Sequence, residues 1–100
     1  MTVSVRALPD RFAVSQNRPN PFNPTTTISL HLPKAAEWAL SVYNVAGQVV
    51  REFSGYSEAG TVDVTWDATD AGGLKVASGI YLYKATAGEF SVTRKMLLMK

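Results

Sequence analysis

The stretch GIYLYKATAGEFSVTRKMLLM, residues 79–99, decides the fold class of this chain. Tyr81 and Tyr83 alternate with their neighbours at a period of two, which is the period of a β-strand. Ala87-Gly88 is a turn dipeptide, and a second run of the same kind begins at Glu89. We therefore predict that this stretch forms a β-hairpin.

The same period continues toward the N-terminus, and no window of twelve residues has a helical stripe. Further strands are predicted at residues 12–14, 26–32, 38–43, 48–53 and 61–66. The predicted inward sets are Ile28, Leu30 and Leu32; Trp38, Leu40 and Val42; and Val62, Val64 and Trp66, with Thr27, Ser29 and His31 on the opposite, polar face. Between two of these strands, NVAG at 44–47 suits a tight hairpin in which Asn44 or Gly47 takes a positive φ.

Seven short strands with turn signals about every ten residues are typical of an immunoglobulin-like β-sandwich. We therefore predict an all-β, seven-stranded, immunoglobulin-like antiparallel β-sandwich, although the disulfide and tryptophan spacing of antibody domains is absent. Residues 9–100 form a single domain in this interpretation, and residues 1–8 are the remnant of a linker. No internal repeat is visible.

Composition excludes several function classes. The 100 residues are 46% hydrophobic and 18% charged, which is enough for one modest core. The net charge of +2 is scattered, with no basic run, so nucleic acid is not an expected partner. No apolar run approaches the length of a transmembrane segment, and the first residues lack the apolar region of a signal peptide. The chain has no cysteine, so its core must hold it without disulfides.

A proline-rich loop, Asn20-Pro21-Phe22-Asn23-Pro24, directly precedes the strand predicted at 26–32. Proline fixes φ and restricts the residue before it, so this loop can be ordered without strand partners. Asparagine side chains can cap the loop's free backbone groups. Phe22 is predicted to seat the loop on one end of the sandwich, since burial of a phenylalanine contributes roughly 1.5 to 3 kcal/mol. We call residues 20–24 the NPF loop.

Candidate chemistry is sparse. His31 has no second histidine or cysteine for a metal site, and no serine lies in a G-x-S-x-G motif. In the acidic loop DATDAGG, residues 67–73, Asp67 and Asp70 are weak candidates for a metal, but Ala71 stands where a calcium loop needs an oxygen donor. We favour Asx-turns at both aspartates. No enzymatic activity and no cofactor are expected.

Tyr81 and Tyr83 have two interpretations. Rings on one face of one strand, about 7 Å apart, could stack against adjacent sugar units. The favoured alternative is that both rings belong to the core, because a sandwich without disulfides needs large side chains.

The chain ends in Arg94, Lys95, Met96, Leu97, Leu98, Met99 and Lys100, which we call the tail segment. Both faces of this strand are largely apolar, which predicts a strand in the middle of a sheet or at an edge covered by another chain. A second interpretation makes the tail segment an element that a partner recognises, for instance by strand addition at a sheet edge. The two interpretations are compatible.

The motifs SQNRPNPFNPTTTISLHLP, LSVYNVAGQVV, SEAGTVDVTWDATDAGGLKVASGIYLYKATAG and TRKMLLMK follow one another from about residue 9 to residue 100. Together they resemble the C-terminal sorting domain, type A, of proteins exported by the type IX secretion system. The WD, GG and ASGIYLY portion is also similar to the immunoglobulin-like domain of the flagellar hook-capping protein. Two positions depart from the sorting-domain pattern: Arg18 replaces a usual aromatic residue, and Ala68 replaces a usual glycine.

The resemblance implies a non-catalytic module at the C-terminus of a larger secreted bacterial protein. Such a module is recognised by sorting machinery at the outer membrane and retains its parent protein outside the cell or on the cell surface. The tail segment would carry the sorting signal, and the parent protein's other domains would precede this one. The alternative is an accessory module of a secreted enzyme that binds carbohydrate, such as a cell-surface polysaccharide, through Tyr81 and Tyr83.

Overall fold

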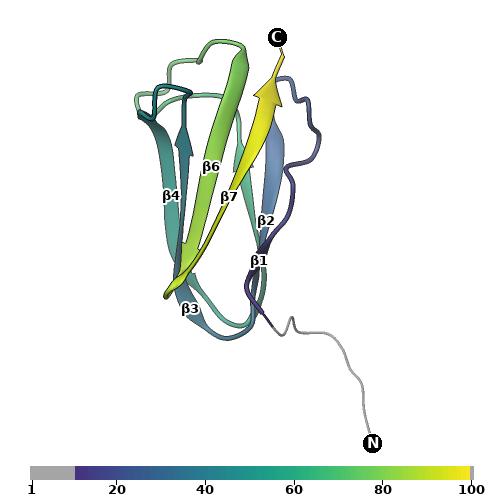
Figure 1. Ribbon diagram of the computed structural model, residues 1–100, viewed down its shortest axis with the longest axis vertical. Coiled ribbons are helices and arrows are strands. Elements are labelled where there is room, and N and C mark those ends of the chain that lie inside the picture. The colour runs from purple at the N-terminus through teal and green to yellow at the C-terminus, as the bar shows by residue number, and fades with distance from the viewer. Residues whose placement is uncertain (1–10, 100) are drawn as a thin grey trace, which may run out of the picture.

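The computed structural model describes residues 11–99, which form two antiparallel sheets packed face to face (Figure 1). The described residues contain seven strands and no helix. The three-stranded sheet has the order β1 (Ala13–Val14), β2 (Thr26–Leu32), β5 (Gly60–Trp66), and the four-stranded sheet has the order β4 (Val49–Ser57), β3 (Ala36–Tyr43), β6 (Gly79–Ala87), β7 (Phe90–Leu98). The predicted immunoglobulin-like sandwich is thereby confirmed. The predicted linker, residues 1–8, lies outside the described residues, as does Lys100.

The core lies between the two sheets, where the predicted alternation places it. Ile28, Leu30 and Leu32 of β2 are fully buried, as are Leu40 and Val42 of β3. Trp66 of β5 is also fully buried, whereas Trp38 and Val62 are only half-buried near the margins of the core. Period-two burial therefore fixes which face of each strand turns inward.

One residue of the predicted polar face of β2 is buried, whereas Thr27 and His31 are half-buried. Ser29 is 4% exposed because the chain before the NPF loop continues β1 alongside β2, where the Arg18 guanidinium donates to the Ser29 hydroxyl over 3.4 Å. Its N–H donates to the Ser15 hydroxyl over 3.0 Å, and its own hydroxyl donates to Asp63 over 2.6 Å. The polar side chain is therefore buried with hydrogen-bond partners, as burial of a polar group requires.

The turns use the residues that the sequence favours, with one exception. In the β3–β4 turn Gly47 takes a φ of 83°, while the Asn44 side chain accepts from the N–H groups of Ala46 and Gln48. After β5, Ala68 has a φ of 64°, a left-handed conformation that glycine adopts far more readily. The chain thus keeps a backbone conformation suited to the usual glycine although alanine occupies the position.

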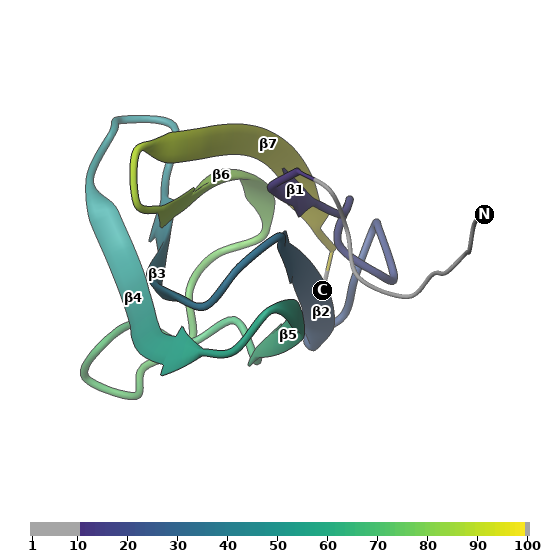
Figure 2. The same cartoon turned by 90° about the horizontal axis from the view of Figure 1, so that it is seen from below.

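The two ends of the sandwich differ in what they carry. The NPF loop, the β3–β4 turn and the acidic loop lie at the upper end in Figure 1, together with the end of β7. The β6–β7 turn, the β2–β3 turn and the beginning of the described chain lie at the lower end, which Figure 2 views along the strands. The predicted loop motif and the predicted tail segment are therefore at the same end.

Candidate functional site

Phe22 holds the NPF loop on the upper end of the sandwich. Its side chain is 1% exposed, and its ring lies 5.7 Å from that of Trp66, centroid to centroid. Trp66 in turn meets Tyr81 edge to face at 5.4 Å. Tilted and edge-to-face rings at such distances attract one another beyond their burial. The predicted seating of the loop by Phe22 is confirmed.

A buried hydrogen-bond network fixes the start of the loop. Asn17, 2% exposed, donates from its side chain to the Thr26 hydroxyl and to the Pro19 carbonyl, at 3.0 and 3.1 Å. The Thr26 hydroxyl also donates to Pro19, over 2.9 Å. The backbone N–H of Asn17 donates to the Tyr83 hydroxyl over 3.0 Å. The network joins the two segments that flank the NPF loop to each other, and Asn17 links them to Tyr83 on β6.

The NPF loop is hydrogen-bonded directly to the tail segment. The Phe22 N–H donates to the Leu97 carbonyl, and the Met99 N–H donates to the Phe22 carbonyl, both over 3.0 Å. The Leu97 N–H donates to the Asn20 side-chain oxygen, also over 3.0 Å. The prediction that Asn20 caps a backbone group of its own loop is therefore wrong. Asn20 caps a backbone group of β7 instead. No hydrogen bond in the described structure involves the Asn23 side chain, whose predicted role stays untested.

Two further hydrogen bonds join β7 to residues 14–16 just before this contact. Gln16 donates from its side-chain amide to the Lys95 carbonyl over 2.8 Å, and Arg94 donates from Nε to the Val14 carbonyl over 2.7 Å. Among the strands, β7 pairs only with β6. The tail segment thus lies at a sheet edge rather than in the middle of a sheet, and the NPF loop of the same chain covers part of that edge. Gln16 was missed in the sequence because nothing local marks it.

The side chains of the tail segment divide between core and solvent. Met96 and Leu98 are buried, at 1% and 0% exposure, and Leu97 is half-buried on the opposite face. Lys95 and Met99 are exposed. A partner that approaches this end would meet exposed side chains on a strand whose backbone edge is already occupied.

Tyr81 and Tyr83 belong to the core, as the favoured interpretation predicted. They are 6% and 0% exposed. The Tyr81 hydroxyl donates to the Ala77 carbonyl over 2.6 Å, and the Tyr83 hydroxyl donates to Ser15 over 2.7 Å. Burial raises the pKa of both hydroxyls. Neither ring presents a face to solvent, so the carbohydrate alternative has no platform at these residues.

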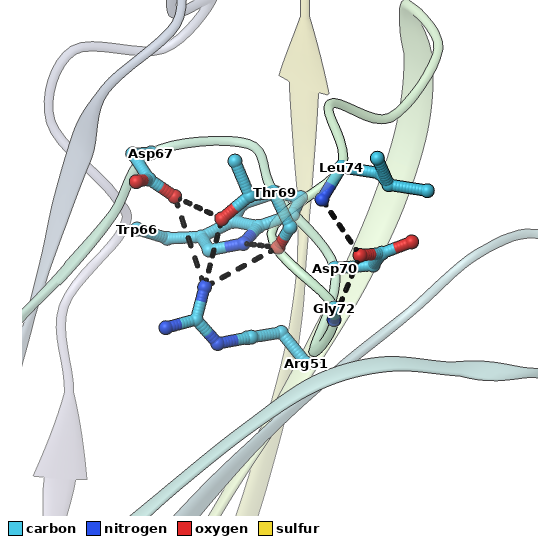
Figure 3. A network of polar contacts seen from close by, with 7 residues as sticks. All are labelled: Arg51, Trp66, Asp67, Thr69, Asp70, Gly72 and Leu74. Carbon is cyan, nitrogen blue, oxygen red and sulfur yellow. Dashed lines mark hydrogen bonds and ion pairs between the residues drawn. The ribbon is translucent and has the colours of Figure 1, made fainter.

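The acidic loop is organised by internal hydrogen bonds (Figure 3). Asp70 accepts from the N–H groups of Gly72 and Leu74, at 2.9 and 3.0 Å, which confirms the predicted Asx-turn there. Asp67 accepts from the Thr69 hydroxyl, over 2.5 Å, and lies 3.8 Å from the Arg51 guanidinium. The Thr69 hydrogen bond is the main cause that lowers the pKa of Asp67. A backbone hydrogen bond of Thr69, the contact of the predicted Asx-turn, also lowers the pKa of Asp67, so side-chain contacts add to the turn at this position.

The acidic loop is also anchored to the core and to β4. Trp66 donates from its indole nitrogen to the Thr69 carbonyl over 2.8 Å, and Arg51 donates to the Thr69 hydroxyl over 2.9 Å (Figure 3). In the part of the chain that the structure describes, no three His, Cys, Asp or Glu side chains gather as metal ligands. Local geometry therefore assigns the two aspartates to the loop's own structure.

The remaining candidates lie apart from one another. His31 contacts the Thr61 hydroxyl over 3.1 Å on the outer surface of β2. A groove of about 630 Å³ lies at the lower end, lined by Lys34, Ala35, Ala36, Glu37, Trp38, Ala39, Ser54, Thr86 and Gly88. His31 does not line that groove. No helix long and apolar enough to span a membrane occurs within residues 11–99.

The sequence model of the FlgD Ig-like domain family matches residues 16–90. The chain belongs to this family. No curated protein matches the chain. The FlgD-like match ends at Phe90, where β7 begins, so the tail segment lies outside it.

Two groups of solved structures are similar to this chain, the first of them FlgD proteins. FlgD of P. aeruginosa is 29% identical, with a TM-score of 0.60, and FlgD of Xanthomonas campestris, a hook-capping protein essential for flagellar assembly, is 26% identical, with a TM-score of 0.59. The similarity covers 73% and 74% of this chain and 57% and 55% of those proteins. This chain thus spans little more than half their length.

The second group comes from Porphyromonas gingivalis. Latent dimeric PorU is 18% identical with a TM-score of 0.73, and the similarity covers 89% of this chain and 9% of PorU. PorZ, an essential surface component of the type IX secretion system, is 24% identical with a TM-score of 0.60, and the similarity covers 91% of this chain and 12% of PorZ. At such identities the likeness shows a shared fold, and this chain corresponds to a small part of each protein.

Proposed function

We propose that this FlgD Ig-like domain is a non-catalytic C-terminal sorting module of the type IX secretion system, of type A. It directs a larger secreted bacterial protein through the outer membrane and retains it outside the cell or on its surface. Sorting machinery at the outer membrane is the partner in this proposal, and the parent protein's other domains precede the module.

One observation carries the proposal: the first and the last of the four motifs that bear the sorting-domain resemblance meet in space. Asn20 and Leu97 are 77 residues apart in sequence and hydrogen-bonded in the fold. The family match leaves the tail segment out, whereas similarity to PorU and PorZ covers about nine tenths of the chain. A sorting function supplies a reason for a FlgD-like domain to carry an ordered tail segment joined to the NPF loop.

The geometry favours a folded signal over an extended peptide. Backbone groups of residues 95, 97 and 99 already have partners in Gln16, Asn20 and Phe22. Strand addition at this edge would have to displace those partners, at a cost of roughly 0.5 to 1.5 kcal/mol for each hydrogen bond. We therefore propose that the partner contacts exposed side chains of the folded tail segment, Lys95 and Met99 among them.

The test is localisation of a reporter that carries its own Sec signal peptide and ends in this 100-residue chain, in a bacterium with a working type IX system. Surface or medium localisation that requires both the translocon and residues 95–100 is the expected result. Reporter held in the periplasm in every strain would overturn the proposal.

Point variants separate the signal from the fold. Lys95→Glu changes an exposed side chain and leaves the backbone contacts of residue 95 in place, so it should reduce export without lowering the melting temperature. Lys75→Glu, an equal charge change outside the tail segment, is the matched control. If Lys95→Glu is exported normally while a chain that lacks residues 95–100 is not exported, the sorting machinery does not recognise the Lys95 side chain.

A further inference from the structure

The outer face of the four-stranded sheet carries two matched rows of side chains. This face points away from the core, and its sheet lies in front of the three-stranded sheet in Figure 1. The upper row crosses three strands as Val49 on β4, Tyr43 on β3 and Leu82 on β6, each paired with the next by the strand register. The lower row follows the same strands as Glu52, Ser41 and Lys84.

The upper row is apolar and accessible. Val49 is 53% exposed, and Tyr43 and Leu82 are half-buried. Ile80, on the same face of β6 one step above Leu82, is 46% exposed. Contiguous apolar side chains on the surface of a soluble domain mark an interaction site. Directly below these rows the side chains are small or polar, namely Ser54, Ala39 and Thr86, and a large exposed side chain returns only at Tyr56, which pairs with Glu37.

The lower row carries two charges without ion-pair partners. Glu52 and Lys84 are exposed and stand on either side of β3, about 10 Å apart by strand spacing. Within residues 11–99 the single ion pair is that of Arg51 with Asp67. Glu52 and Lys84 therefore offer one negative and one positive group at equal distances from the middle strand.

We propose that this face is an interface with a second copy of the chain, related by a two-fold axis that lies in the interface and follows β3. Rotation by 180° about such an axis places β4 of one copy opposite β6 of the other, because these strands are the two neighbours of β3. Val49 then lies opposite Leu82 of the second copy, and Glu52 lies opposite Lys84 of the second copy. Tyr43 and Ser41, near the axis, meet their own counterparts.

Every position of the two rows meets a compatible one in this arrangement. The apolar side chains of the upper row face the apolar side chains of the second copy. Each Glu52 carboxylate faces a Lys84 ammonium group, so two ion pairs form in each dimer. An unrelated partner would need this pattern only by coincidence, whereas a second copy supplies it by symmetry.

The next positions down the sheet also fit. Ser54 on β4 would face Thr86 of the second copy, and Ala39 would face its counterpart, so small side chains allow the sheets to approach to about 10 Å. Glu37 lies about 20 Å below Tyr43 along β3. Sheets packed face to face cross at about 30°, so the two copies of Glu37 diverge from each other at this distance.

The dimer leaves the NPF loop outside the interface. The axis follows β3, so β7 lies beyond the facing strands β4 and β6, and its outer edge, with the NPF loop, points away from the axis. Lys95 pairs with Leu82 in the β6–β7 register and therefore lies on the same outer face, at the margin of the interface. Charge changes at Glu52 and Lys84, which lie outside the tail segment, test self-association separately from export.

The experiment is sedimentation equilibrium of the 100-residue chain over a concentration series up to about 1 mM, the range in which a weak dimer is populated. The wild-type chain should dimerise. Glu52→Lys alone and Lys84→Glu alone should each weaken self-association at least about tenfold, since each places like charges opposite one another twice in the dimer.

Mixing the two single variants decides the geometry. Glu52→Lys carries lysine at both positions and Lys84→Glu carries glutamate at both, so a mixed dimer has two opposite-charge contacts. The mixture should associate as the wild type does, and so should the double variant. Glu58→Lys and Lys75→Glu, equal charge changes at exposed sites outside the rows, should leave association unchanged.

Two results would overturn the proposal. A wild-type chain that stays monomeric at the highest concentration has no such interface. A wild type that dimerises while the single variants dimerise equally, or while their mixture fails to recover, uses another surface. Unchanged melting temperatures of the single variants exclude misfolding as the cause of a loss.

Discussion

The two edges of the four-stranded sheet are protected in different ways. At β7, the NPF loop supplies backbone hydrogen bonds to residues 97 and 99, and Gln16 covers residue 95. At β4, no further strand pairs with the outer edge in the described structure, and the contact is a side chain, Arg51, that reaches the acidic loop. Both edge strands also direct an arginine inward, Arg94 toward Val14 and Arg51 toward Thr69.

The two edges show that backbone hydrogen bonds and side-chain contacts hold a strand edge to different extents. Backbone hydrogen bonds at β7 set the position of the tail segment residue by residue, so its order depends on a loop far away in sequence. The contact at β4 ties two loops together through one partly exposed arginine, and exposed ion pairs contribute little to stability. Disruption of the first should therefore propagate to the tail segment, and disruption of the second should stay local.

The largest effect is expected from Phe22→Ala. Loss of a fully buried ring costs about 3 to 5 kcal/mol of unfolding free energy, measured by chemical denaturation. Because Phe22 holds the loop against β7, the amides of Leu97 and Met99 should also lose protection from hydrogen exchange before global unfolding. Protection at those amides that falls only as much as that of β2 would show that the loop does not order the tail segment.

Tyr83→Phe should cost less, about 1 to 3 kcal/mol, since it leaves the Asn17 N–H and the Ser15 carbonyl without their partner while the ring stays buried. The raised pKa of Tyr83 adds a pH dependence. A tyrosine whose folded pKa exceeds 10.0 contributes stability that is present below pH 10 and lost above it. Denaturation of wild type and variant at neutral and high pH should show a smaller alkaline loss in the variant.

Strands and turns were predictable because they depend on neighbours in sequence. The alternation of apolar and polar residues in the sequence predicted seven strands, and the structure contains all seven. The Asx-turn at Asp70 follows from a local pattern of aspartate and glycine. The inward side of β6 was not decided by alternation alone. Its register with β3, which aligns Tyr83 with the buried Val42, settles that question.

The contact between loop and tail was not predictable because no local signal reports it. Asn20 was expected to cap its own loop, and its partner is 77 residues away. Likewise Ser29 follows the polar alternation of β2, yet the chain before the loop covers it. Contacts between distant segments depend on how the layers stack, which periodicity does not encode.

Asn20→Ala tests the backbone contact with little change in packing. It removes the acceptor of the Leu97 N–H, at an expected cost of about 1 kcal/mol. Asn23→Ala, in the same loop, should leave the free energy of unfolding nearly unchanged. Hydrogen exchange at Leu97 should be faster in the first variant only, and equal rates in both would contradict the proposed closure of this edge.

Thr69→Val should have the smallest effect, below about 1 kcal/mol, because the contacts it removes link partly exposed groups at the β4 edge. Its signature is in the pH dependence. The Thr69 hydroxyl lowers the folded pKa of Asp67 below 3.8, so the stability it contributes is present above pH 3.8 and lost as the pH falls through the folded pKa. The variant should therefore lose less stability on acidification, as measured by denaturation at a series of pH values. Faster exchange in the tail segment of this variant would mean that the two edges are coupled through Trp66, against the local response expected at β4.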